Sequence, residues 1–328
     1  MLLRTIKPTR YFSDELLSHY RQQTDPAADA IIEQVAAAGG PAGVRTFLQQ
    51  RTEGKIPLKE VPECRRFLCE EGRLPDWADA KQMASGIRLF QRHRDTITLL
   101  LGCLSLPYAY LAADGVQVLA LSKRMQNDTR QRLEETGAFV FGITEAEAWQ
   151  GKYPSAIERI LNVRLIHAVV RWFCRHSNRW NPAWGEPVNQ EDMAGTNLTF
   201  SYIIIQGLRK NGIEPNEKEA EAYLHFWKVV GYLSGVPEDL LPENLREAYV
   251  LGQSIARRLF RPSPEGQQLT QALLRALEDT VPEGLKTLPA AQMRFLLGDE
   301  YADQLALPAV PLEKRLVRLL PMRIFFRP

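Results

Sequence analysis

Apolar side chains return every three or four positions along most of the chain, which is the period of an amphipathic helix. We find no run in which apolar and polar residues alternate between hairpin-forming turns, as they would along strands. The pattern therefore predicts an all-α fold, organised as a single large helical domain with little or no sheet.

Clusters of glycine, proline and small polar residues interrupt this pattern and mark the expected connections between helices. They lie at residues 39–43, 53–62, 177–187, 237–242 and 262–266. We interpret residues 76–262 as the helical core, residues 1–75 as an N-terminal helical extension, and residues 263–328 as a C-terminal helical extension packed on the core.

Four helices are predicted between residues 157 and 260. The first covers residues 157–178. The second begins at Asn189, whose side chain is suited to cap a helix N-terminus, and continues as far as Gly212. Two further helices are expected over residues 217–234 and 239–260.

The longest apolar stretch, residues 98–113, raises the question of a membrane span. It contains 16 residues and is interrupted by Gly102 and Pro107. A spanning helix needs roughly 20 apolar residues, so the length favours a buried, kinked helix.

Composition narrows the class of partner. Hydrophobic residues make up 45% of the chain and charged residues 24%, and the formal net charge is only +2. Such a small charge does not favour a nucleic-acid partner, so small or apolar partners are expected. The start, MLLRTIKPTRYF, has no apolar run like that of a signal peptide, which leads us to expect a cytoplasmic protein. The four cysteines form no CxxC pair and are expected to be reduced thiols.

One histidine stands out because of its neighbours. His167 lies in the apolar stripe of the predicted 157–178 helix, with Arg164 three residues before it and Arg171 four residues after it. All three side chains emerge on the same helical face. Haem would satisfy this pattern, because its iron takes a neutral imidazole, its porphyrin fills an apolar slot, and its propionates pair with arginine.

A purely structural interpretation is also open. A histidine on an apolar face is commonly a hydrogen-bonded core residue. The two arginines would then pair with acidic side chains across a helix interface, for which Glu134 and Glu158 are candidates.

Three segments resemble the family that holds the latex-clearing proteins, which are rubber oxygenases, and the MpaB-type oxygenases. The first is Arg164-Leu-Ile-His167-Ala-Val-Val-Arg171, the second GEPVNQEDMAGTNLTFSYIIIQGLR, and the third HFWKVVGYLSGV at residues 225–236. Their order and spacing match as well, and together they cover much of residues 120–260.

This resemblance implies globin-like packing of helices around a non-covalently bound haem b, with His167 as the iron ligand. It further implies that Arg164, Arg171 and Thr199 lie at the haem. The spacing permits the role of Thr199, because Thr196, Thr199, Ile203 and Gln206 share one helical stripe. Close helix packing beside Gly195 is the alternative role for Thr199.

The resemblance also identifies candidate catalytic residues on the other side of the iron. Rubber-cleaving relatives carry an Arg-x-x-Lys-Thr motif there, and the corresponding run in this chain is Arg132-Leu-Glu-Glu135-Thr136. A carboxylate thus replaces the lysine, so a lysine-capped iron does not carry over. Glu135 is either an acid or base near bound oxygen or a solvated side chain on a charged helix. The acidic residue that such relatives use as a base has only a weak candidate here, Asp114.

The resemblance implies oxygen chemistry, so we expect a haem-dependent oxygenase. Its partners would be O₂ and an unsaturated, apolar, isoprenoid-like or lipid-like small molecule, cleaved oxidatively at a C=C bond. The alternatives are a peroxide-using enzyme, a haem sensor or store, or a haem-free helical interaction module. Residues 312–328 interleave basic and apolar side chains, which fits either peripheral membrane contact or a tail packed on the domain. The sequence gives no indication of the oligomeric state.

Overall fold

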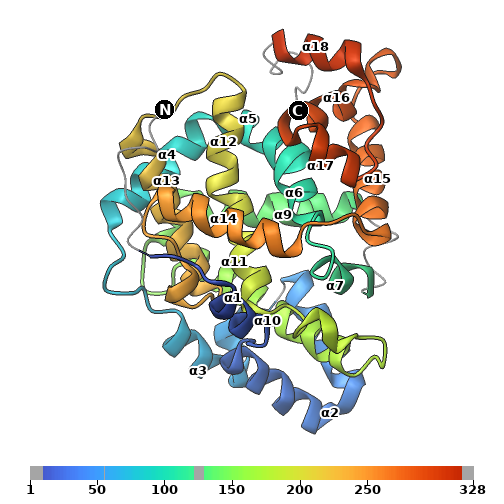
Figure 1. Ribbon diagram of the computed structural model, residues 1–328. Helices are drawn as coiled ribbons and strands as arrows, with labels where there is room; N and C mark the ends of the chain where they lie inside the picture. Colours follow the sequence, from blue (N-terminus) through green and yellow to red (C-terminus); the bar gives the residue numbers. More distant parts are fainter. Residues whose placement is uncertain (1–9, 55, 122–128, 320–328) are drawn as a thin grey trace.

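The computed structural model describes residues 10–54, 56–121 and 129–319. Figure 1 shows helices throughout these ranges, and their only pairing of strand type is an isolated bridge between Ala112 and Phe260. The predicted all-α fold is confirmed.

The longer helices follow one another along the chain with short connections. They are α1 (Asp14–Arg21), α2 (Pro26–Glu53), α3 (Pro62–Glu71), α4 (Ala80–Arg92), α5 (Arg94–Leu100), α6 (Leu106–Tyr110), α7 (Val116–Leu121), α9 (Thr129–Ile143), α10 (Ser155–Arg175), α11 (Gln190–Phe200), α12 (Tyr202–Lys210), α13 (Glu217–Leu233), α14 (Leu245–Leu259), α15 (Pro264–Glu278), α16 (Leu288–Leu297), α17 (Asp299–Gln304) and α18 (Pro311–Leu319). Short 3₁₀ helices are η2 (Leu58–Glu60), η4 (Ala146–Trp149), η5 (Pro182–Trp184), η6 (Glu238–Leu240) and η7 (Glu283–Leu285), and η3 (Leu101–Ser105) is a π-helix.

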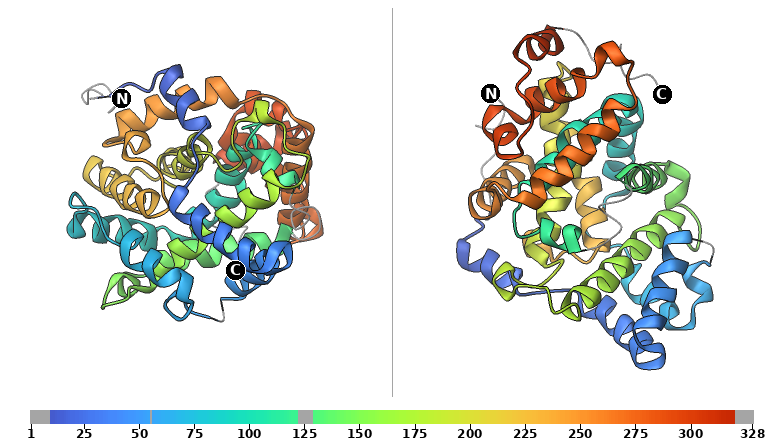
Figure 2. Two further views of the ribbon diagram at one scale, coloured as in Figure 1. Left: turned by 90° about the horizontal axis from the view of Figure 1, so that it is seen from below. Right: turned by 90° about the vertical axis from the view of Figure 1, so that its right-hand side faces the viewer.

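Helices from the two halves of the sequence lie at opposite ends of the molecule. In Figures 1 and 2, α2 and α3 pack with α10 at one end, and α15 to α18 gather at the other. One continuous hydrophobic cluster nevertheless extends from Phe12 to Leu307. Both proposed extensions therefore contribute side chains to the same core as the central helices.

Helices α4 and α13 pack along much of their length, and Gly86 permits the close approach. A Cβ atom at this position would lie 2.7 Å from the carbonyl oxygen of Ala222 and 2.9 Å from Cβ of Phe226. Only a residue without a side chain allows the two backbones to come this near.

The apolar stretch 98–113 forms a buried, interrupted helix, as predicted. Between α5 and α6 the hydrogen-bonding pattern widens into the π-helix η3, whose five residues are all buried. No helix in the described ranges is both long enough and apolar enough to cross a membrane.

Two predicted helices differ from those observed. The helix expected from Asn189 to Gly212 is broken at Ser201, where φ is −106° and ψ is −89°, so that α11 and α12 are separate. The hydroxyls of Thr196, Thr199 and Ser201 donate to main-chain carbonyls here, and such bonds commonly bend helices. The helix expected from residue 239 begins only at Leu245, with Asn244 as its N-cap.

The other two helices follow the prediction closely: α10 spans Ser155–Arg175 and α13 spans Glu217–Leu233. The cap of α11 is also confirmed, because the Asn189 side chain accepts a hydrogen bond from the backbone of Asp192. Of the C-terminal tail, α18 is described, and its Val317 packs against Leu288 of α16. Residues 320–328 of the predicted membrane-contact segment lie outside the described residues.

Candidate functional site

Helix α10 presents two different faces. Leu161, Leu165 and Ala168 lie in the core with almost no exposed surface. A second stripe, at steps of three and four residues, contains His167 together with Val163, Ile166 and Val170, and its members are only half-buried. His167 therefore stands on an apolar surface that the described residues cover incompletely.

The chemistry of the His167 ring is that of a neutral imidazole. Burial and the nearby positive charge of Arg171 lower its pKa to about 4. Its Nδ1 atom is buried and has no hydrogen-bond partner among the described residues. A neutral ring with an unpaired nitrogen is the form in which histidine binds a metal.

A small cavity adjoins this ring on the arginine side of the helix. Its volume is about 10 Å³, which is roughly the space that one water molecule needs. It is lined by Asp25, Arg164, His167, Arg171, Val188, Gln190, Met193 and Ser234. A porphyrin does not fit in this space, so it could contact His167 only from the half-buried stripe.

Both arginines beside His167 are buried and paired with carboxylates. Arg164 binds Asp25 in a bidentate ion pair, with 2.8 Å between Nη2 and Oδ1, and a further nitrogen lies 2.8 Å from Glu71. Nε of Arg171 lies 2.7 Å from Asp29, and its Nη1 donates to the carbonyl of Val188 at 2.8 Å.

Arg164 and Arg171 thus form ion pairs across a helix interface, as the structural interpretation of the sequence allowed, but their partners are other acidic residues. The carboxylates come from the start of α2 and the end of α3 and not from Glu134 or Glu158. Glu134 pairs with Arg130, and Glu158 accepts a hydrogen bond from the backbone of Leu58. The expected roles of Arg164 and Arg171 at a haem remain predictions.

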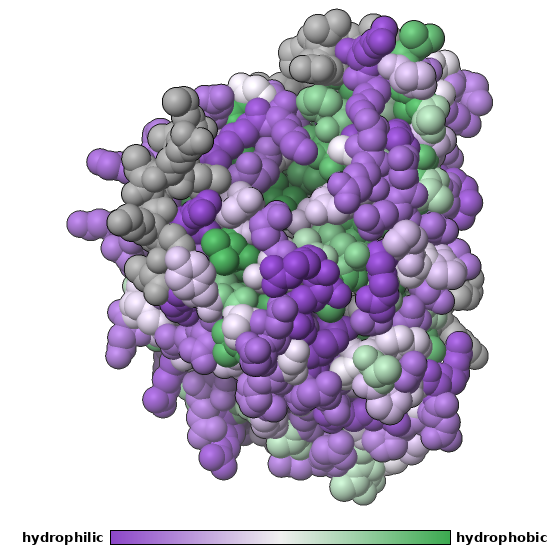
Figure 3. All heavy atoms as spheres, viewed as in Figure 1, coloured by the Kyte–Doolittle hydropathy of each residue, from purple (hydrophilic) through white to green (hydrophobic). Residues whose placement is uncertain are grey.

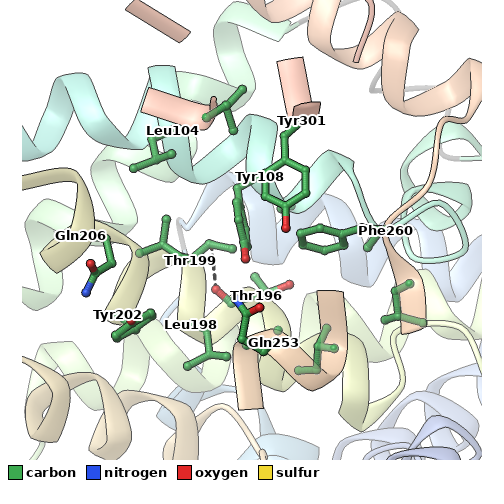
Figure 4. A pocket seen from close by; sticks show the side chains of 18 of the residues that line it. Leu104, Tyr108, Thr196, Leu198, Thr199, Tyr202, Gln206, Gln253, Phe260 and Tyr301 are labelled. Carbon is green, nitrogen blue, oxygen red and sulfur yellow. Dashed lines mark hydrogen bonds between the residues drawn. The ribbon is translucent and has the colours of Figure 1, made fainter. Parts of the chain in front are cut away.

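A much larger cavity, of about 290 Å³, lies between α6, α11, α12, α14, α16 and α17 (Figure 4). Thr196, Thr199, Ile203 and Gln206, which the sequence places on one stripe, all line it. The Thr199 hydroxyl donates to the carbonyl of Thr196 at 2.8 Å. Thr199 and His167 line separate cavities, although Met193 of the same helix α11 lines the one beside His167.

The three candidate catalytic residues lie on α9, which packs against α10. The side chain of Arg132 lies outside the described residues. Glu135 is exposed and accepts a hydrogen bond from Nε2 of Gln131 at 2.8 Å, and Thr136 is half-buried. Their roles remain predictions.

Asp114, the weak candidate for a base, is buried and held by two arginines. Arg261 donates a hydrogen bond to its carboxylate, and Arg21 lies 3.6 Å from the same group. Its position is set by this buried ion network, which also includes Asp192 on α11.

Sequence reasoning missed Asp25 and Asp29, which pair with the arginines of α10. A signal was present, since Asp25 precedes Pro26 as the N-cap of a helix does, and Asp29 follows one turn later. It also missed Tyr108, Phe260 and Tyr301, which line the large cavity from three different segments.

Comparison with known proteins accounts for the resemblance. Residues 90–327 match the family model described as the catalytic domain of the ER-bound oxygenase mpaB/B' and rubber oxygenase. A rubber oxygenase from Streptomyces sp. (strain K30) is 25% identical over 317 residues, which are 92% of this chain and 75% of that protein.

A solved structure of latex clearing protein in the closed state has the same fold. Its TM-score is 0.75 at 24% sequence identity, over 92% of this chain and 83% of that one. The predictions of the family and of an oxygenase enzyme are confirmed. From the match over residues 90–327, we conclude that the chain belongs to the family of the mpaB and rubber oxygenases.

Proposed function

We propose that this chain is a haem b-dependent oxygenase acting on an unsaturated, apolar, isoprenoid-like or lipid-like small molecule. The observation that carries the proposal is the state of His167: a neutral ring, with a buried and unpartnered Nδ1, on a half-buried apolar stripe. Haem iron needs one such nitrogen from the protein, and its porphyrin needs an apolar surface.

The residues beside His167 fit this group. Val163, Ile166 and Val170 offer apolar contact, and burial keeps the imidazole unprotonated at neutral pH. Arg164 and Arg171 lie beside the small cavity on the other side of His167, so we propose that they support the site by positioning α10. Their pairing with Asp25 and Asp29 fixes the rotation of α10 and with it the direction of His167. Bound haem would supply the iron at which oxygen is activated.

For the side of the iron facing the substrate we propose Arg132, Glu135 and Thr136. Arg132 and Thr136 would donate hydrogen bonds to oxygen, and Glu135 would hold or release a proton. The substrate class follows the named substrate of the Streptomyces relative, a rubber oxygenase. Rubber is an unsaturated isoprenoid chain, and oxidative cleavage of a C=C bond is the proposed reaction.

The absorption spectrum of the purified protein tests the cofactor. Protein produced with ample iron and porphyrin should show a Soret band, and His167→Ala should lose or displace it. His19→Ala is a matched control, because this exposed histidine on α1 lies outside both cavities. A colourless wild-type protein, or an unchanged Soret band in His167→Ala, would contradict the proposal.

A charge reversal on α9 tests the proposed oxygen site. Glu135→Lys should shift the Soret band or alter the binding of a small iron ligand such as cyanide, since an amine near the iron competes for it. Glu134→Lys makes the same change at the neighbouring exposed position. Identical spectra and cyanide affinities in both variants would remove Glu135 from the site.

A further inference from the structure

The large cavity joins an apolar interior to a polar corner near the surface. Figure 4 shows Tyr108, Phe260 and Tyr301 together on one side and Gln206 on the other. Figure 3 shows a hollow in the molecular surface with hydrophobic residues at its floor. A volume of about 290 Å³ is near the lower end of the range for small-molecule sites, roughly 300 to 1,000 Å³.

The apolar side is built from aromatic rings that pack edge to face. The ring centroid of Tyr108 lies 4.9 Å from that of Phe260 and 5.9 Å from that of Tyr301. Burial raises the pKa of Tyr108, so its hydroxyl remains neutral. Leu104, Leu198 and Ile203 complete a wall suited to a hydrocarbon chain.

The polar corner consists of Gln206 and Lys210, one turn apart on α12 and both lining the cavity. Nε2 of Gln206 is buried and has no hydrogen-bond partner among the described residues. Lys210 is exposed, which places it where the cavity reaches the surface. Both donors therefore line the cavity from one helix, and Asp192, a carboxylate that also lines it, is paired with Arg21.

No carboxylate of the described chain pairs with Lys210. Among the described residues its ammonium has one partner, the carbonyl oxygen of Leu296 at 2.6 Å. Two of its three N–H donors therefore have no partner among these residues. Partial burial lowers the pKa of Lys210, because the surroundings supply no compensating negative charge. A partly desolvated cation and an unsatisfied amide donor together favour an anionic acceptor.

We infer that this cavity binds an apolar chain ending in a carboxylate, with the carboxylate at Lys210 and Gln206 and the chain against Tyr108, Phe260 and Tyr301. This binding site does not depend on bound haem, whereas the role of such an acid as the substrate of the enzyme rests on the proposed function.

Calorimetric titration of the full chain with three probes of equal chain length tests the inference. Decanoate should bind at least about tenfold more tightly than decan-1-ol, and decyltrimethylammonium should bind more weakly than either. Equal affinity for decanoate and decan-1-ol, stronger binding of the cation, or no binding of decanoate would overturn it.

Two variants locate the carboxylate. Lys210→Met should weaken decanoate about tenfold or more and change decan-1-ol by less than about threefold. Lys218→Met, which removes an exposed lysine that does not line the cavity, should leave both affinities unchanged. If Lys210→Met does not fold, Gln206→Leu provides the same comparison. Unaltered decanoate binding in the folded variant would contradict the assignment.

These titrations are independent of the test for haem. A colourless protein that binds decanoate would overturn the proposed cofactor and leave the ligand site standing. A protein with a Soret band that binds no decanoate would do the opposite.

Discussion

Asp25 and Arg164 form a buried ion pair that joins the N-terminus of α2 to the middle of α10. The Asp25 carboxylate also accepts a hydrogen bond from the backbone of Ala28, so it caps α2 as well. One turn along α2, Asp29 holds Arg171, seven residues after Arg164. Two contacts at this separation prevent α10 from rotating about its axis and thereby fix the face that carries His167.

Removing Arg164 should strongly destabilise the protein. In Arg164→Met the carboxylate of Asp25, which is only 6% exposed, loses its cation, and an uncompensated buried charge costs about 3 to 5 kcal/mol. Urea denaturation would measure the free energy of unfolding. Arg159→Met, at an exposed position of the same helix, should change it by less than about 0.5 kcal/mol. A loss below about 1 kcal/mol in Arg164→Met would show that the pair is not energetically important.

The pKa of His167 predicts how the stability of the metal-free protein depends on pH. The folded-state pKa of about 4 lies below the ordinary value of 6.5, so the unfolded chain binds the proton more readily. This contribution is complete above about pH 6.5 and is lost as the pH falls toward 4, by up to about 3 kcal/mol.

The measurement is the free energy of unfolding at several pH values in the wild type and in His167→Leu, which cannot titrate. The difference between the two curves isolates His167 from other titrating groups such as His225, whose pKa is also lowered, mainly by burial. Parallel curves between pH 4 and 6.5 would show that His167 titrates normally in the folded protein.

Asn189 should contribute more to the stability of the protein than an ordinary helix cap does. Its side chain accepts from the backbone of Asp192 and donates to the carboxylate of Asp192 at 2.8 Å, and it is fully buried. Asn189→Ala should therefore cost about 2 kcal/mol, at the upper end for an N-cap. Asn181→Ala removes the cap of the exposed helix η5 and should cost less than about 0.5 kcal/mol in the same denaturation assay. Equal losses would mean that burial adds nothing to the cap.

Two glycine-to-alanine substitutions should have opposite effects, one at the contact of α4 with α13 and one on α9. Gly86→Ala must push the helices apart. It should lower the free energy of unfolding by about 1 to 3 kcal/mol and the melting temperature with it. Gly137→Ala on α9 meets only Phe141, at an ordinary 3.6 Å, and should stabilise its helix by about 0.5 to 1 kcal/mol. Calorimetry would compare both with the wild type, and an unaffected Gly86→Ala would argue against the close approach.

The helices could be predicted from sequence because their signals are local. Apolar spacing defined α10 and α13, and the cap of α11 was recognisable from Asn189 alone. The break at Ser201 was not, since a serine inside an apolar run breaks a helix only when the surrounding packing permits it.

The site was predictable in part, for the same reason. The stripe of Thr196, Thr199, Ile203 and Gln206 follows from helical geometry and does face one cavity. The partners of Arg164 and Arg171 depend on which helix packs against α10, and local sequence does not contain that information. Residues more than a hundred positions apart meet there.

The position of Asp25, Asp29 and Glu71 bears on how the protein can be divided. All three precede residue 90, where the match to the catalytic-domain family model begins. A fragment cut at that point would keep the guanidinium groups of α10 and discard their counter-ions. Helices α2 and α3 are thus a structural component of the unit that carries His167, and a truncated protein should retain them.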